Sequence, residues 1–117
     1  MRLKLYIKGN EIIIEDIKRC GLFRRMIGLM FSRRERANAL LFDFGENRVG
    51  IHSFFVFFPF LAIWLDKKNR VVDYKIIYPF TLFITSNKKF SRLIEVPLNK
   101  KYKEIFTYFK INWIRGT

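Results

Sequence analysis

Residues 51–66, IHSFFVFFPFLAIWLD, are the most apolar and most aromatic stretch of the chain. A membrane-spanning helix needs about 20 apolar residues, whereas this run is shorter, has His52 near one end and carries Pro59 at its centre. Proline cannot donate to a β-ladder, so we place Pro59 at the junction of two buried strands, residues 49–57 and 60–66. The stretch therefore predicts the centre of a sheet and no transmembrane segment.

Alternating and short apolar runs on either side of this centre predict the remaining strands. They are expected at residues 3–7, 11–17, 39–44, 70–77, 81–84, 90–96 and 111–114. Gly9 and Asn10 tolerate positive φ and are expected to form a two-residue hairpin loop. Asp66 is expected to form a turn before the strand at 70–77, in which Val72, Tyr74 and Ile76 would face inward.

Two short helices complete the predicted fold. Apolar residues recur at helical spacing over residues 22–31, and Gly28 weakens that helix. A second, amphipathic helix is expected at residues 100–109, with Asn99 as its N-cap. The chain is therefore expected to be one α+β domain, residues 1–117, predominantly β, with about seven or eight strands in a small curved or barrel-like sheet.

Composition describes a strongly basic protein without disulfides. The net charge is +13, which attracts polyanions such as nucleic acid or an anionic surface at low salt. Abundant lysine, arginine and isoleucine without glutamine is equally typical of heat-adapted proteins, in which charge serves the surface. The single cysteine, Cys20, cannot form an internal disulfide, and the N-terminus lacks the apolar run of a signal peptide, so a cytoplasmic location is expected.

Several motifs, taken in order, resemble the domain-of-unknown-function family 192. They are RMIGLMF from Arg25, ALLFDF from Ala39, the 51–66 stretch, and LIEVP from Leu93. The resemblance spans Cys20 to about Asn99 and implies a small, compact, β-rich domain of archaeal or bacterial type, for which the family has no established activity. Phe57 and Leu61 stand where the family usually carries a basic and an acidic residue, which implies that a polar pair has become apolar.

Candidate binding residues are basic. The densest group, suited to phosphate because of the arginine fork, is Arg24, Arg25, Arg33, Arg34 and Arg36. A second group is Lys88, Lys89, Lys100, Lys101 and Lys103. Solvated charge is the competing interpretation of both groups, because no nucleic-acid-binding motif accompanies them.

His52, the only histidine, is a candidate binding residue at the rim of the core, and a general acid or base is the alternative role. Cys20 beside Arg19 is a candidate reactive thiol or an inert one. The carboxylates are too scattered to predict a metal site, a catalytic pair or a cofactor.

Two functions remain open. The first is a non-enzymatic binding or accessory domain whose basic surface contacts a phosphate-bearing or anionic partner. The second is an enzyme or small-ligand carrier with a pocket near His52. The protein would be a monomer, or a homodimer if surplus phenylalanine surface forms an interface.

Overall fold

The structure, a computed structural model, describes residues 1–20, 37–44, 59–78, 86 and 88–111. Its strands are β1 (Leu3–Ile7), β2 (Asn10–Ile14), β3 (Lys18–Cys20), β4 (Leu40–Asp43), β5 (Phe60–Leu65), β6 (Val71–Ile77) and β7 (Arg92–Pro97). A 3₁₀ turn, η2 (Lys100–Tyr102), leads directly into helix α1 (Lys103–Thr107).

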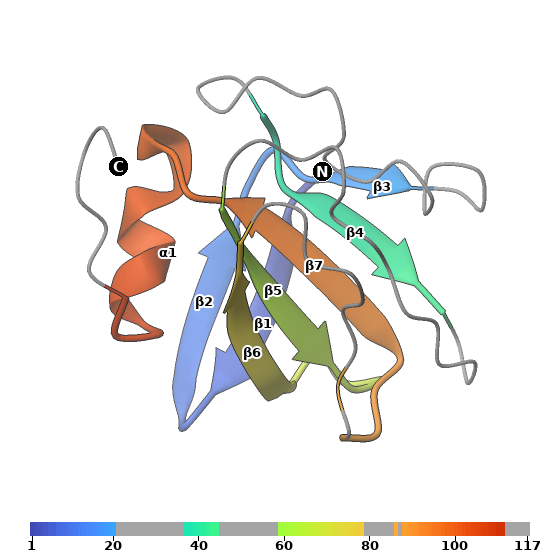
Figure 1. The fold of residues 1–117 in the computed structure, drawn as a ribbon. Coiled ribbons are helices and arrows are strands. Elements are labelled where there is room, and N and C mark those ends of the chain that lie inside the picture. The colour runs from blue at the N-terminus through green and yellow to red at the C-terminus, as the bar shows by residue number, and fades with distance from the viewer. Residues whose placement is uncertain (21–36, 45–58, 79–85, 87, 112–117) are drawn as a thin grey trace.

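The strands form two sheets (Figure 1). β1 and β2 make an antiparallel hairpin, and the other five are ordered β3-β4-β7-β5-β6. Only the β3–β4 pair is parallel among the pairings of the described strands. The hairpin approaches the larger sheet at β6, where the N–H of Tyr6 donates to the carbonyl of Asn69 at 3.0 Å.

β5 is buried along its whole length, as its continuous apolar sequence predicts. Leu61, Ile63 and Leu65 project into a core that includes the hairpin and the C-terminal helical segment. The alternate residues Phe60, Ala62 and Trp64 project into a second, aromatic core on the other face of the sheet. Pro59 directly precedes the strand, so this half of the central stretch is confirmed. The other expected strand, residues 49–57, lies outside the described residues.

The first hairpin forms where it was expected, but its loop is one residue earlier. Ile7 pairs with Asn10, so Lys8 and Gly9 are the loop, with φ values of 47° and 80°. A two-residue turn of this kind needs positive φ at both positions, and glycine suits the second. The expected loop at Gly9–Asn10 is therefore wrong by one residue.

β2 also ends earlier than predicted. Asp16 has a φ of 54°, which interrupts the strand after Ile14. The chain then enters β3 at Lys18, where no strand was predicted. The hydrogen bond from the N–H of Lys18 to the carbonyl of Ala39, at 2.9 Å, explains this difference, because β3 is held by a partner distant in sequence.

β6 is the expected strand with one irregularity. Leu65 pairs with Val71 and Trp64 pairs with Asp73, so Val72 is an extra residue in the ladder. This bulge places Val72 against the aromatic core, while Tyr74 and Ile76 pack against the other core. The prediction that all three face the same way is therefore wrong for Val72.

The C-terminal helical segment begins at the expected cap and is shorter than expected. The side chain of Asn99 accepts a hydrogen bond from the N–H of Lys101 at 3.1 Å. The predicted stripe of Tyr102, Ile105, Phe106 and Phe109 is buried in the core. The helix ends at Thr107, and Lys110 adopts a positive φ of 55°.

The protein is therefore predominantly β with an α+β composition, as predicted. The predicted barrel is wrong, because the hairpin and the five-stranded sheet are two separate sheets in the described part of the chain. The expected helix at residues 22–31, the expected strand at 81–84 and all of the expected strand at 111–114 except Ile111 lie outside the described residues. Ile111, the last of the described residues, belongs to no strand.

Candidate functional site: a polar groove beside the C-terminal helix

The predicted arginine group and His52 do not fall in the described part of the chain. This applies to Arg24, Arg25, Arg33, Arg34, Arg36 and His52, and to Phe57. Leu61, the other departure from the family pattern, is fully buried in the core that the hairpin shares. An apolar residue is thus well packed at this position.

The second basic group lies in the described part of the chain, where it divides into two separate groups. Lys88 and Lys89 precede β7, whereas Lys100, Lys101 and Lys103 follow it. The six residues of β7 separate them by roughly 20 Å at the rise of an extended strand. The two groups therefore lie at opposite ends of one central strand and cannot form a single compact patch.

A groove of about 280 Å³ lies between the end of β2 and the C-terminal helical segment. Ile13, Glu15 and Asp16 line one side, and residues 100–105 line the other. The second side brings Lys100, Lys101 and Lys103 to the same hollow. The groove thus contains one of the two lysine groups, and its location was not predicted.

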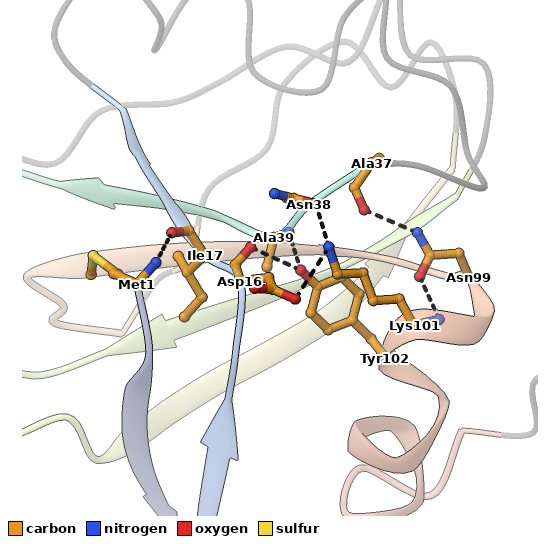
Figure 2. A network of polar contacts seen from close by, with 9 residues as sticks. All are labelled: Met1, Asp16, Ile17, Ala37, Asn38, Ala39, Asn99, Lys101 and Tyr102. Carbon is orange, nitrogen blue, oxygen red and sulfur yellow. Dashed lines mark hydrogen bonds and ion pairs between the residues drawn. The ribbon is translucent and has the colours of Figure 1, made fainter.

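Tyr102 fixes the relative position of the two sides (Figure 2). Its hydroxyl accepts a hydrogen bond from the N–H of Ala39 at 2.8 Å and donates one to the carbonyl of Asp16 at 3.1 Å. Burial raises the pKa of Tyr102, and the nearby Asp16 carboxylate adds to that effect. The hydroxyl therefore stays protonated and can act as donor and acceptor at once.

Asn99 and Lys101 tie the same segment to the strand entry at residues 37–39 (Figure 2). The side-chain amide of Asn99 donates to the carbonyl of Ala37 at 3.1 Å, in addition to capping η2. Lys101 donates to the Asn38 side chain at 2.6 Å and lies 3.4 Å from the Asp16 carboxylate. Three groups, from residues 99, 101 and 102, therefore hold the wall of the groove in place.

The electrostatics of the groove are mixed. Lys100, Lys101 and Lys103 stand among the carboxylates of Glu15, Asp16 and Glu104. Lys101 is already compensated by Asp16, so the exposed ammonium groups left for a partner are those of Lys100 and Lys103. The helical wall therefore presents two ammonium groups that form no ion pair among the described residues.

Glu95 is a second unusual group, in the middle of β7 and only 2% exposed. Its register partners are Leu40 and Ala62, and its Oε1 atom has no hydrogen-bond partner among the described residues. Burial raises the pKa of Glu95 to about 8. The carboxyl is therefore mostly protonated at neutral pH, which removes one negative charge from the formal balance of +13.

Neither Glu95 nor Tyr102 was singled out as functional from the sequence. Glu95 had a visible signal, because it is the one acidic residue inside the otherwise apolar run 93–98 of an expected strand. Tyr102 had none: its phenol belongs to a helix stripe typical of core packing, and its two hydrogen-bond partners are remote in sequence. Asn99 was predicted correctly as a cap, without its second role at Ala37.

Within the described ranges, no group of three or more histidine, cysteine, aspartate or glutamate side chains could hold a metal ion. The same part of the chain contains no helix that is long and apolar enough to cross a membrane.

Two solved structures are similar to this one. A proposed transcription regulator from Sinorhizobium meliloti 1021 matches with a TM-score of 0.70 and 19% identity, over 90% of this chain and 84% of that one. A protein of unknown function from Novosphingobium aromaticivorans DSM 12444 matches with a TM-score of 0.61 and 13% identity, over 90% and 76%. No protein-family model and no curated protein matches the chain. At these identities the likeness establishes a shared fold alone.

Proposed function

We propose that this protein is a non-enzymatic binding domain whose basic surface contacts a phosphate-bearing polyanion, with nucleic acid as the partner. The observation that carries the proposal is that most of the described carboxylates are already paired or neutral. Many basic side chains are therefore left without an ion pair. Glu11, Glu15, Asp16, Asp43 and Asp66 each lie within 4.0 Å of a basic side chain. Glu95 is buried and mostly neutral.

The basic side chains that remain are exposed. Within the described residues, those with no ion pair are Lys8, Arg19, Lys68, Lys88, Lys89, Lys100, Lys103 and Lys110. Exposed ammonium groups that are not held by carboxylates are available to displace counterions from a phosphate backbone. The fold shared with a proposed transcription regulator agrees with this partner, although it carries no residue-level information.

Fluorescence anisotropy with labelled duplex DNA, duplex RNA and single-stranded RNA tests the proposal. At about 50 mM salt we expect binding that weakens steeply by about 200 mM, with a linear dependence of log K on log salt. Absence of binding at low salt to all three probes would refute the proposal.

A pair of variants locates the contact. Lys100→Ala with Lys103→Ala should lower the salt slope by about two if both lysines contact phosphate. Thr107→Ala, on the same helix and without a charge change, is the matched control and should leave the slope unchanged. Lys88→Ala with Lys89→Ala tests the opposite end of β7 in the same way.

We further propose that the chain is a member of domain-of-unknown-function family 192, and that it acts in the cytoplasm. Support for the family comes from the ordered motifs, one of which, LIEVP, is the central strand β7. The second function, an enzyme or carrier with a pocket near His52, remains a hypothesis. The groove in the described residues is lined by other side chains and gives it no support.

A further inference from the structure

The outer edge of β2 is open among the described residues, where β2 pairs with β1 alone. In a hairpin with a two-residue loop, the pair that flanks the loop is hydrogen-bonded, and bonded and non-bonded pairs then alternate. Ile7 and Asn10 flank the loop, so the opposed pairs Tyr6–Glu11 and Lys4–Ile13 are non-bonded. The main-chain N–H and C=O groups of Glu11 and Ile13 therefore point away from β1.

The β1 side of the hairpin confirms this alternation. Tyr6, opposite Glu11, directs its N–H away from β2 and donates to the carbonyl of Asn69 at 3.0 Å. The outward groups of β1 are thus engaged with the larger sheet at that point. The outward main-chain N–H and C=O groups of Glu11 and Ile13 make no hydrogen bond among the described residues.

Two features beside this edge favour a partner. Ile13 is 39% exposed although it is a large aliphatic residue in a strand. The groove of about 280 Å³ begins at Ile13 and extends to the C-terminal helical segment. An edge strand with free main-chain groups and an adjacent hollow is the arrangement used in recognition by strand addition.

We propose that an extended, acidic peptide segment of a partner protein binds here, pairing its main chain with Glu11 and Ile13 and turning acidic side chains toward Lys100 and Lys103.

Charge decides between the occupants of such an edge. A second copy of this chain would bring another net charge of +13 to the same place, and that repulsion opposes symmetric pairing. An acidic segment meets Lys100 and Lys103 instead. Of the carboxylates in the groove, Glu15 and Asp16 are paired with Arg2 and Lys101, and Glu104 alone forms no ion pair among the described residues. Glu11 does not oppose it strongly, because the Lys4 ammonium lies 2.8 Å from the Glu11 carboxylate.

A fluorescein-labelled peptide of alternating glutamate and threonine is the probe, and anisotropy at about 50 mM salt is the measurement. The Ile13→Pro variant removes one outward N–H without removing a hydrogen bond to β1. We expect it to weaken binding about tenfold, while Ile13→Thr stays within about twofold. Lys100→Glu with Lys103→Glu should also weaken binding at least about tenfold. Thermal melting checks that each variant folds.

A second peptide separates strand pairing from charge attraction. It has the same sequence, with the backbone N-methylated at alternate residues, so its charge is unchanged while one edge cannot hydrogen-bond. Equal affinity for the two peptides, or an Ile13→Pro variant that binds the first as tightly as the unsubstituted protein, would overturn the proposal. So would sedimentation showing a dimer that Ile13→Pro dissociates. Because Ile13→Pro leaves every lysine in place, its nucleic-acid affinity should not change, which distinguishes this site from the proposed function.

Discussion

The hydroxyl of Tyr102 donates a hydrogen bond to the carbonyl of Asp16 at 3.1 Å, across 86 positions of sequence. It also accepts the N–H of Ala39. One phenol therefore joins the exit from the N-terminal hairpin, the entry to β4 and the start of the C-terminal helical segment. The groove has its shape because these three segments meet at this oxygen.

Replacing Tyr102 with phenylalanine keeps the ring in the core and removes both hydrogen bonds. The Ala39 N–H is then left buried without a partner, which costs about 1–3 kcal/mol. We expect Tyr102→Phe to lower the free energy of unfolding by that amount in urea denaturation. Tyr108→Phe, at a tyrosine that is 46% exposed, is the control and should change it by less than about 0.5 kcal/mol. Equal effects would show that the Tyr102 hydroxyl has no special role.

Glu95 makes the stability depend on pH between its unfolded pKa of 4.5 and its folded pKa of about 8. Its pKa is about 8 in the folded protein against 4.5 for the unperturbed group. As pH rises above the lower value, the unfolded chain loses this proton first, so the folded state is disfavoured progressively. Stability from this source is full below the unfolded pKa and is lost as pH rises through about 8, by a few kcal/mol in total.

The variant Glu95→Gln tests this assignment, because an amide has a similar shape and no proton to lose. We expect its free energy of unfolding to change much less than that of the unsubstituted protein between about pH 5 and about pH 9. The same change at the exposed Glu104 is the matched control for replacing one glutamate by glutamine. A profile that Glu95→Gln does not flatten would show that the carboxyl is not buried as described.

Asn99 caps η2 through one hydrogen bond, from the N–H of Lys101, and links the segment to Ala37 through another. Asn99→Ala removes both and should cost about 1–3 kcal/mol in urea denaturation. Asn99→Ser keeps an oxygen that can cap η2 and loses the link to Ala37. An intermediate value for serine is therefore expected. A serine variant as unstable as the alanine variant would mean that the cap contributes little.

The sequence predicts local features well where one segment determines them. Apolar continuity predicts the complete burial of β5, and helical spacing predicts the buried stripe from Tyr102 to Phe109. Pairing between remote segments is not local, and for this reason β3 and the Val72 bulge were missed. The groove could not be predicted for the same reason, since its two walls, near Asp16 and Tyr102, come together only in the folded protein.

Asp66, which was predicted as a turn residue, is an example of a feature that one local segment determines. Its carboxylate accepts the N–H groups of Lys68 and Arg70 at 2.8 and 2.9 Å, and the Arg70 side chain at 2.7 Å. Burial alone would raise the pKa of Asp66, but these donors together hold it below its usual value. The contribution of the turn is therefore present above the unfolded pKa and is lost as pH falls through the lowered one.

Asp66→Ala should destabilise the protein by about 1–2 kcal/mol near neutral pH, because two main-chain N–H groups lose their acceptor. Asp66→Asn keeps one acceptor oxygen and should recover part of that loss. As pH falls through the lowered pKa of Asp66, the unsubstituted protein should approach the stability of the asparagine variant, since its carboxyl then becomes protonated. Urea denaturation of the three proteins at acidic and neutral pH measures this, and a difference that is unchanged at acidic pH would contradict the assignment.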